Sequence, residues 1–131
     1  IVLLFCNLLR EFHDNSLGDE NGNKHKIVDI LKYIEDNYSS ATLESTAQYL
    51  GYHPNYLSSL ITKSTGKTFK ELLISQRLSQ ACGFLKTTDL PVSEIAENVG
   101  YINQGFFYKK FQDCYHMTPA DYRQLCRNSN H

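Results

Sequence analysis

Apolar residues along the chain recur at the spacing of amphipathic helices, and no stretch reads strongly as a β-strand. The first clear stripe follows the spacing i, i+3, i+4, i+7 and i+11. Its members are Ile27, Ile30, Leu31, Ile34 and Tyr38. This stripe predicts a helix that ends near Asn37. Similar patterns predict further helices over 43–50, 54–64, 69–85, 92–99 and 104–115, and a last one that starts at 118–121. We therefore expect an all-α fold.

A pattern of about twenty residues occurs twice within these helices. In each copy an Ala precedes a Gly by four residues, and apolar residues flank the pair. The pairs are Ala47 with Gly51 and, 49 residues later, Ala96 with Gly100. A small Ala lets a second helix cross closely over the first, and Gly supplies the unusual backbone of the turn. The repeat therefore predicts two helix-turn-helix motifs, at about 43–65 and 92–115.

Residues with capping preferences mark the ends of these helices. Thr42 offers an N-cap hydroxyl to the helix over 43–50, and Asn103 can cap the helix over 104–115. Pro54 suits the first turn of its helix, and Gly66 ends that helix. The seventeen positions of 69–85 would span about 25 Å as a helix. Such a helix could join the two motifs and hold them near the ~34 Å repeat of successive major grooves.

Two segments precede the helices. The stretch 1–12 is apolar on almost every face, so as a helix it would need partners on several sides. It reads as the terminal helix of an upstream domain, either a dimerising helix or one that packs only on that domain. Residues 13–24 are rich in Asn, Asp and Gly, which is typical of a flexible linker. Because the chain opens without an initiator Met, we expect a fragment whose main domain covers 25–131.

The net charge of the chain is −1, but the charge is unevenly distributed. Residues 1–23 carry one base, Arg10, against four acids, whereas residues 24–131 carry twelve bases against ten acids. Within 53–88, five bases face the single acid Glu71. A local basic surface of this kind is compatible with nucleic-acid binding despite the overall charge.

Other classes of function find little support. The four cysteines, Cys6, Cys82, Cys114 and Cys126, show no CxxC spacing and no histidine at ligand intervals. We therefore expect reduced thiols and no zinc. The five histidines are scattered without a recurring carboxylate or nucleophile, so we expect neither an enzyme nor a cofactor. The apolar opening run is shorter than the ~20 residues that span a bilayer, and no basic stretch or small-residue cleavage site marks it as a signal peptide. These features predict a cytoplasmic protein without a membrane partner.

The segments GYHPNYLSSLITKSTGKTF and VSEIAENVGYINQGFFYKKFQDCYHMTPADYR resemble the C-terminal DNA-binding domain of the AraC/XylS family of bacterial transcription regulators. The resemblance covers about 24–127. The residues on the family signature are Ile95, Ala96, Gly100, Tyr101, Phe107, Phe111, Pro119, Tyr122 and Arg123. The resemblance implies about seven helices in two homeodomain-like helix-turn-helix subdomains, joined by the long helix. It also implies that both recognition helices enter adjacent major grooves of double-stranded DNA.

Several residues depart from the usual pattern of the family. Ser59 and Thr62 stand where similar sequences often have Arg or Lys, and Gly105 replaces a small hydroxyl residue. Asp113 replaces a usual base, and His116 a usual Gly. These changes predict a weaker affinity for phosphates than is typical of the family.

The periodicity of the two recognition helices separates inward from outward positions. The outward residues that we expect to contact base edges are Asn55, Ser58, Ser59, Thr62, Gln104, Gly105, Tyr108 and Lys109. Asn and Gln can pair with adenine and Lys with guanine, whereas Ser and Thr accept several bases. The alternative is a polar face that is only solvated. For Tyr56 and Phe106 we favour partial packing over base contact.

The expected phosphate contacts are Lys63, Lys67, Arg77, Lys110 and Arg123. Arg77 could instead pack its stem on the long helix over 69–85 and pair with an acid, and Arg123 could form a structural pair. Together these residues predict a sequence-specific regulator of transcription that binds DNA. The expectation of an activator comes from the family resemblance and not from these residues. RNA polymerase is an expected further partner, and a homodimer through the upstream region is another option. The alternative function is a helical protein-interaction module that has lost DNA affinity.

Overall fold

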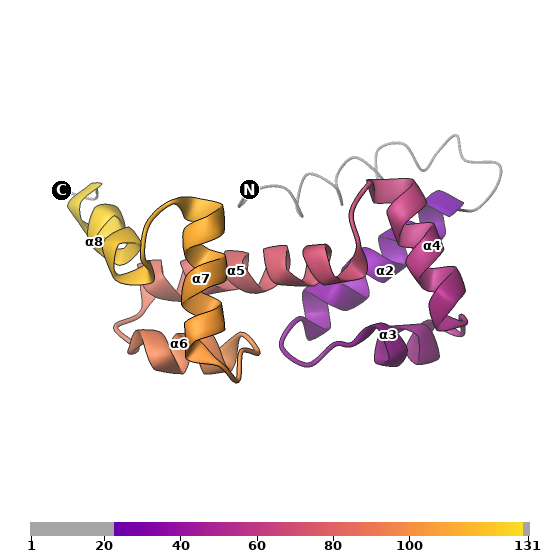
Figure 1. Ribbon diagram of the computed structural model, residues 1–131, viewed down its shortest axis with the longest axis horizontal. Helices are drawn as coiled ribbons and strands as arrows, with labels where there is room; N and C mark the ends of the chain where they lie inside the picture. The colour runs from indigo at the N-terminus through magenta and orange to yellow at the C-terminus, as the bar shows by residue number, and fades with distance from the viewer. Residues whose placement is uncertain (1–22, 130–131) are drawn as a thin grey trace. The chain divides into compact units, whose positions relative to one another are not determined.

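The computed structural model describes residues 23–129, which form seven α-helices (Figure 1). They are α2 (Asn23–Asn37), α3 (Leu43–Leu50), α4 (Pro54–Thr65), α5 (Phe69–Thr87), α6 (Val92–Asn98), α7 (Gln104–Tyr115) and α8 (Pro119–Ser129). The prediction of an all-α fold is confirmed. The expected helix over 1–12 and the stretch 13–22 lie outside the described residues, whereas Asn23 and Lys24 of the expected linker belong to α2.

The predicted caps hold the helix starts in place. The Thr42 hydroxyl accepts a hydrogen bond from the Ser45 amide at 3.0 Å, and Ser45 Oγ accepts one from the Thr42 amide at 2.9 Å. Before α7, Asn103 Oδ1 accepts from the Phe106 amide at 3.1 Å. These bonds satisfy amides that lack a partner in the first helical turn. The sequence analysis did not predict a cap from His53, whose Nδ1 accepts from the Asn55 amide at the start of α4.

The chain divides into two compact units, and α5 runs from one into the other. The N-terminal unit is described from Asn23 to Gln76, and α2, α3, α4 and the first half of α5 surround its core. Its largest fully buried side chains are Ile27, Ile30, Leu31, Ile34, Leu57, Ile61 and Leu72. Ala47 on α3 is also buried, as the repeat predicts. The apolar stripe of α2 thus covers the first helix-turn-helix motif.

The C-terminal unit is described from Arg77 to Ser129 and has an aromatic core. Phe107 and Phe111 of α7 are fully buried, with ring centroids 5.9 Å apart. The Phe111 ring also meets Tyr115 at 4.6 Å and Tyr122 of α8 at 5.7 Å. Leu85, Ile95 and Val99 complete the core from α5 and the α6 region. This packing fixes which side of α7 remains outside.

Gly51 ends α3 in the left-handed region, at φ 79°, which confirms the predicted role of this glycine in the turn. A Cβ at Gly51 would meet nothing within 4 Å, so a substitution would cost backbone strain alone. We expect Gly51→Ala to lower the free energy of unfolding by about 1–2 kcal/mol. Gly83 lies inside α5 in open space without a positive φ. Gly83→Ala should therefore raise the free energy of unfolding by about 0.5–1 kcal/mol. Urea titration of the two variants beside the unaltered chain would measure both changes. Equal effects of the two variants would contradict the assigned backbone.

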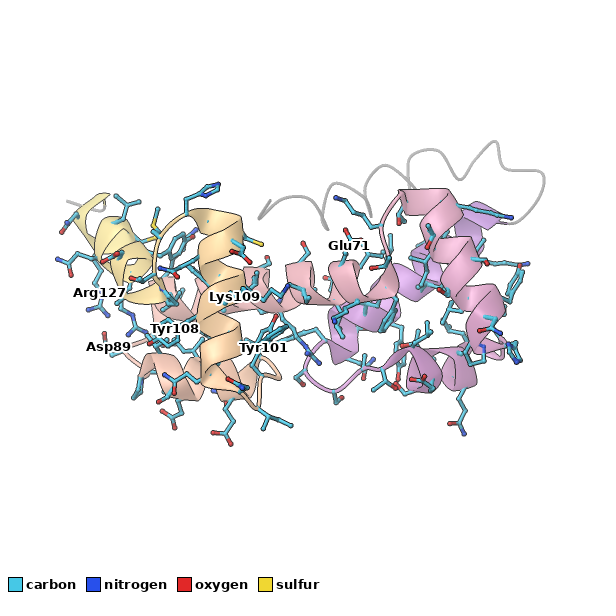
Figure 2. All side chains as sticks on the ribbon, in the orientation of Figure 1. Glu71, Asp89, Tyr101, Tyr108, Lys109 and Arg127 are labelled. Carbon is cyan, nitrogen blue, oxygen red and sulfur yellow. The ribbon has the colours of Figure 1, made fainter. Side chains whose placement is uncertain are left out.

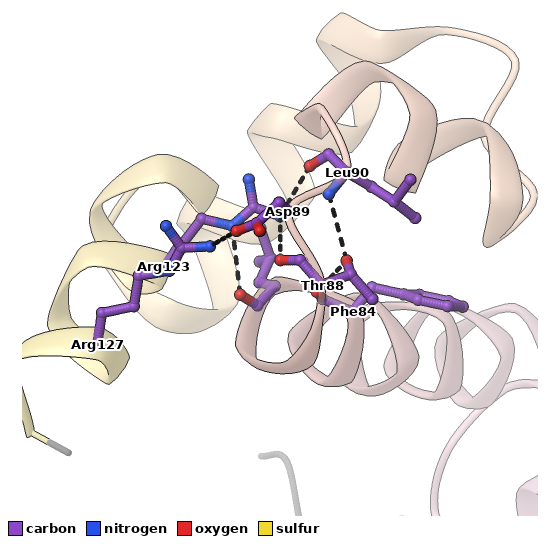
Figure 3. Close-up of polar contacts among 7 residues, drawn as sticks. Phe84, Thr88, Asp89, Leu90, Arg123 and Arg127 are labelled. Carbon is purple, nitrogen blue, oxygen red and sulfur yellow. Dashed lines mark hydrogen bonds and ion pairs between the residues drawn. The ribbon is translucent and has the colours of Figure 1, made fainter.

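Arg123 of α8 binds three main-chain carbonyl groups of the same unit (Figure 3). Its Nε donates to the Leu85 oxygen at 3.2 Å, and its Nη2 donates to the oxygens of Thr88 at 3.2 Å and Leu90 at 2.7 Å. Arg123 is therefore a clamp between α8 and the segment that joins α5 to α6. This guanidinium is partly buried and already engaged, which favours the structural role left open for Arg123, and its contact with DNA phosphate stays a prediction.

His116 follows α7 and is the one non-glycine residue with positive φ, at 60°, in the described part of the chain. Left-handed backbone is unfavourable for residues with a Cβ. We expect His116→Gly to raise the free energy of unfolding by about 0.5–1 kcal/mol, because relief of strain exceeds the added entropy of the unfolded chain. Thermal denaturation would measure this, with His116→Ala as the control that keeps the strain. A glycine variant no more stable than the alanine variant would contradict the prediction.

Candidate nucleic-acid interface

In the N-terminal unit, α4 follows the turn at Gly51 and presents a polar face. Leu57, Leu60 and Ile61 are buried against the core. Asn55, Ser59 and Thr62 are exposed and lie at i, i+4 and i+7, which is one side of the helix. Ser58 is half-buried, and its carbonyl accepts a hydrogen bond from the Thr62 hydroxyl at 3.0 Å. The structure thus gathers the expected base-contact residues of the first motif on one face of α4.

In the C-terminal unit, α7 follows the turn at Gly100 and repeats this arrangement. Its exposed residues include Gln104, Gly105 and Lys109, of which Gly105 and Lys109 are one turn apart. Figure 2 shows Lys109 on α7. Tyr108 is half-buried, and the edge of its ring meets Phe107 at 6.1 Å. A Cβ at Gly105 would approach Asn103 Oδ1 to 3.2 Å. A larger residue at 105 would therefore press on the side chain that caps α7.

The third residue of each recognition helix is aromatic and lies close to a lysine ammonium group. Tyr56 of α4 stacks near Tyr52, with ring centroids 5.6 Å apart, and Lys26 Nζ donates to the Tyr56 hydroxyl at 3.2 Å. The ring centroids of Phe106 on α7 and Tyr101 lie 5.8 Å apart, and Lys110 Nζ lies 5.2 Å from the centroid of the Phe106 ring. These contacts agree with the expected partial packing of Tyr56 and Phe106. They also hold two ammonium groups beside the first turns of α4 and α7.

The residues expected to contact phosphate differ in solvent exposure and in the contacts that they already make. Lys63 is exposed on α4, and Lys67 is half-buried in the loop after Gly66. The Arg77 guanidinium lies 5.5 Å from the centroid of the Tyr101 ring, and burial lowers the pKa of Arg77. Burial also raises the pKa of Tyr101 to about 12. Arg77 thus contacts an aromatic residue in the turn of the second motif, a contact that the sequence analysis did not predict.

Two further residues beside the helix starts were not anticipated. Ile102 precedes α7 and is 104% exposed, so its apolar side chain projects fully into solvent. Lys26 lies on α2, 30 residues from the Tyr56 that it contacts. No sequence signal connects Lys26 with α4, whereas an isoleucine in a turn, directly before the polar Asn103 and Gln104, is a visible anomaly.

The described residues contain no group of three His, Cys, Asp or Glu side chains that could hold a metal ion. Between Asn23 and Ser129, no helix is both long and apolar enough to cross a membrane.

Comparisons with known proteins place this geometry in a family. A family model described as a helix-turn-helix domain matches residues 46–125. The chain is 40% identical to the uncharacterized HTH-type transcriptional regulator YtdP of Bacillus subtilis, over 76% of this chain and 13% of that protein. It is 30% identical to the regulatory protein SoxS of Escherichia coli, over 74% of this chain and 92% of SoxS.

The fold is also similar to a solved structure. The C-terminal domain of AraT, a response regulator from Geobacillus stearothermophilus, has a TM-score of 0.67 at 38% identity, over 72% of this chain and 79% of that one. Both YtdP and SoxS are named as regulatory proteins. The duplicated helix-turn-helix motif, the matched residues and these similarities together show that the chain belongs to the AraC/XylS family of DNA-binding transcription regulators.

Proposed function

We propose that this chain reads two successive major grooves of duplex DNA, with α4 in one and α7 in the next. The observation that carries the proposal is the division of each helix into two sides. In both, a fully buried apolar stripe faces the core of its own unit, and exposed polar residues occupy the opposite side. Docking the N-terminal part of such a helix in the major groove is the common geometry of helix-turn-helix proteins.

Base readout is assigned to the exposed residues of these two helices. Asn55 and Gln104 have the amide chemistry that pairs with adenine, and Lys109 can donate to guanine. The hydroxyls of Ser58, Ser59 and Thr62 suit less selective contacts. At Gly105 the absence of a side chain allows close approach of the backbone, and Tyr108 flanks it. Ile102 is placed to contact a thymine methyl group.

Phosphate contacts are assigned to Lys63, Lys67 and Lys110, with Arg77 as a supporting contact from α5. RNA polymerase and a second copy of the chain, joined through the upstream region, are proposed as further partners. The family resemblance supports polymerase, and the apolar stretch 1–12 supports the dimer. The exposed residues of α4 and α7 support neither of these two partners.

Selection of bound sequences from random duplex DNA tests the proposed function. The chain should enrich a site with two preferred segments about one helical turn apart, because each recognition helix reads its own groove. Enrichment of one segment would mean that one motif reads DNA. Failure to enrich any sequence, with retained folding, would favour the rival function of a protein-interaction module.

Replacement of the exposed Lys63 provides a test of a phosphate contact. We expect Lys63→Ala to weaken binding to all sequences about evenly and to lower the slope of log K against log salt by about 1. Fluorescence anisotropy at several salt concentrations would measure the slope. Lys32→Ala is the matched control, because Lys32 is an exposed lysine of the same unit that lies on α2 rather than on α4. A sequence-selective loss from Lys63→Ala would instead indicate base contact.

A further inference from the structure

A second surface of the N-terminal unit lies on α2 and the end of α3. It contains no residue of the recognition helix α4, and its charge is negative, whereas that of α4 is positive. These two helices enclose a pocket of about 300 Å³. Asp29, Lys32, Tyr33 and Asp36 line it from α2, and Tyr49 lines it from α3. The four α2 residues are spaced i, i+3, i+4 and i+7, so they share one face of the helix. None of them takes part in the proposed DNA contacts.

Two tyrosine rings form the apolar wall of this pocket. The centroids of Tyr33 and Tyr49 lie 4.7 Å apart, with 33° between the ring planes. Tyr33 packs against the core of the unit and is therefore fixed. Tyr49 remains 73% exposed. An exposed aromatic side chain with a polar rim is the usual composition of a protein contact surface.

Two carboxylates without an ion-pair partner form the rim. Asp29 and Asp36 are both exposed. The structure shows no ion pair of Asp29 or Asp36 with another residue between Asn23 and Ser129. Lys32 lies between them on α2 and leaves the pocket with two acids and one base. A pocket that combines unpaired carboxylates with exposed aromatic faces is complementary to a cation.

The charge of the pocket excludes two candidate occupants. DNA carries a negative charge on every phosphate and would be repelled by Asp29 and Asp36. The N-terminal part of this chain is also acidic, because residues 1–23 carry one base against four acids. The complementary occupant is therefore a basic group from another molecule.

We propose that the α2–α3 pocket docks an arginine side chain of a partner protein. A planar guanidinium can stack on Tyr49 while it donates two hydrogen bonds to a carboxylate, which a lysine ammonium does less well. A free small cation would leave the exposed Tyr49 largely uncovered, whereas the residues beside an arginine in a protein segment would cover it. The proposal does not depend on DNA binding by α4 or α7.

The test is an NMR titration of the whole chain with a capped peptide, acetyl-Ala-Leu-Arg-Leu-Ala-amide, in the absence of DNA. Two parallel probes separate the sources of affinity. One is the same peptide with neutral citrulline in place of arginine, and the other is acetyl-arginine methylamide. The arginine peptide should give saturable shifts at Asp29, Tyr33, Asp36 and Tyr49. The citrulline peptide should give none, and the single amino acid should bind at least about threefold more weakly.

Three exposed positions on α2 provide matched variants. Asp36→Asn should weaken the arginine peptide about threefold, as for loss of an exposed ion pair, and Lys32→Gln should strengthen it by a similar factor. Glu35→Gln makes the same charge change as Asp36→Asn outside the pocket lining, and should have little effect. Tyr49→Ala should abolish the shifts, and Tyr49→Phe should keep them.

Four results would overturn the proposal. Equal binding of the arginine and citrulline peptides would exclude a cation site. Equal affinity for the peptide and the single amino acid would point to a small-molecule site. Equal effects of Glu35→Gln and Asp36→Asn would reduce the interaction to general charge attraction. If the arginine peptide causes no NMR shifts although the chain is folded, the pocket does not bind arginine.

Discussion

Replacing Arg123 by Ala should lower the free energy of unfolding of the C-terminal unit by about 2–5 kcal/mol. Arg123 donates to the carbonyl oxygens of Leu85, Thr88 and Leu90, which lie 33–38 residues earlier in the chain. Hydrogen bonds from a charged donor are among the stronger ones, and their loss leaves carbonyl groups without partners near the core. A loss of this size is a large part of the stability of a small domain. Urea denaturation followed by circular dichroism would measure it.

Arg127→Ala is the matched control for this prediction. Arg127 lies one turn further along α8 and pairs with Asp89, but this pair is exposed (Figure 3). Its loss should cost less than about 1 kcal/mol. Arg123→Lys should resemble Arg123→Ala, because one ammonium group cannot reproduce the planar donor arrangement. If Arg123→Ala keeps full stability and loses DNA affinity at low salt, the residue contacts phosphate and the clamp is not important.

Lys109→Ala should reduce discrimination between a selected site and a scrambled one by about 1–3 kcal/mol, a factor between about 5 and about 150. Lys109 is exposed on the outward side of α7, one turn after Gly105, where the backbone can approach DNA closely. A well-oriented contact to a base edge carries this much selectivity. Ser59→Ala should cost much less, because water can replace a single hydroxyl contact. The two motifs should therefore contribute unequally to specificity.

Lys110 offers a control at the neighbouring position. Its ammonium group lies over the Phe106 ring, and the residue is half-buried. As a phosphate contact, Lys110→Ala should weaken binding to both DNAs equally, whereas Lys109→Ala should act mainly on the selected site. Anisotropy titrations of both variants on both DNAs would compare these effects. Equal loss on both DNAs for Lys109→Ala would assign Lys109 to phosphate.

Local signals in the sequence were sufficient for the framework of the fold. Thr42 and Asn103 cap the helices that their positions predict, and Gly51 adopts the left-handed backbone that the turn requires. The periodic apolar residues of α4 and α7 are the buried ones, so the outward sides of both helices could also be predicted. These features depend on neighbours within a few residues. The linker helix differs by two residues, because α5 continues to Thr87.

Contacts between distant residues could not be predicted in this way. The carbonyl groups that bind Arg123 become neighbours only after α8 packs on the end of α5. The contact between Lys26 and Tyr56, and the stacking of Tyr33 on Tyr49, likewise require the packed helices. Composition assigned a charge to Arg123 and Lys26, but the partner of each charge depends on tertiary structure. The partners of these two charges therefore had to come from the structure, while the contacts of the base-contact and phosphate candidates with DNA stay predictions.

The dependence of DNA affinity on salt, for the selected site and for a scrambled duplex, tests the central claim most directly. If α4 and α7 lie in the grooves while lysines contact phosphates, affinity for both DNAs should fall as salt rises. Each phosphate contact should contribute about −0.9 to the slope of log K against log salt. The selected site should also remain tighter at every salt concentration, because base contacts add to the phosphate contacts. A flat salt dependence, or equal affinity for the two duplexes, would contradict sequence-specific DNA recognition by this chain.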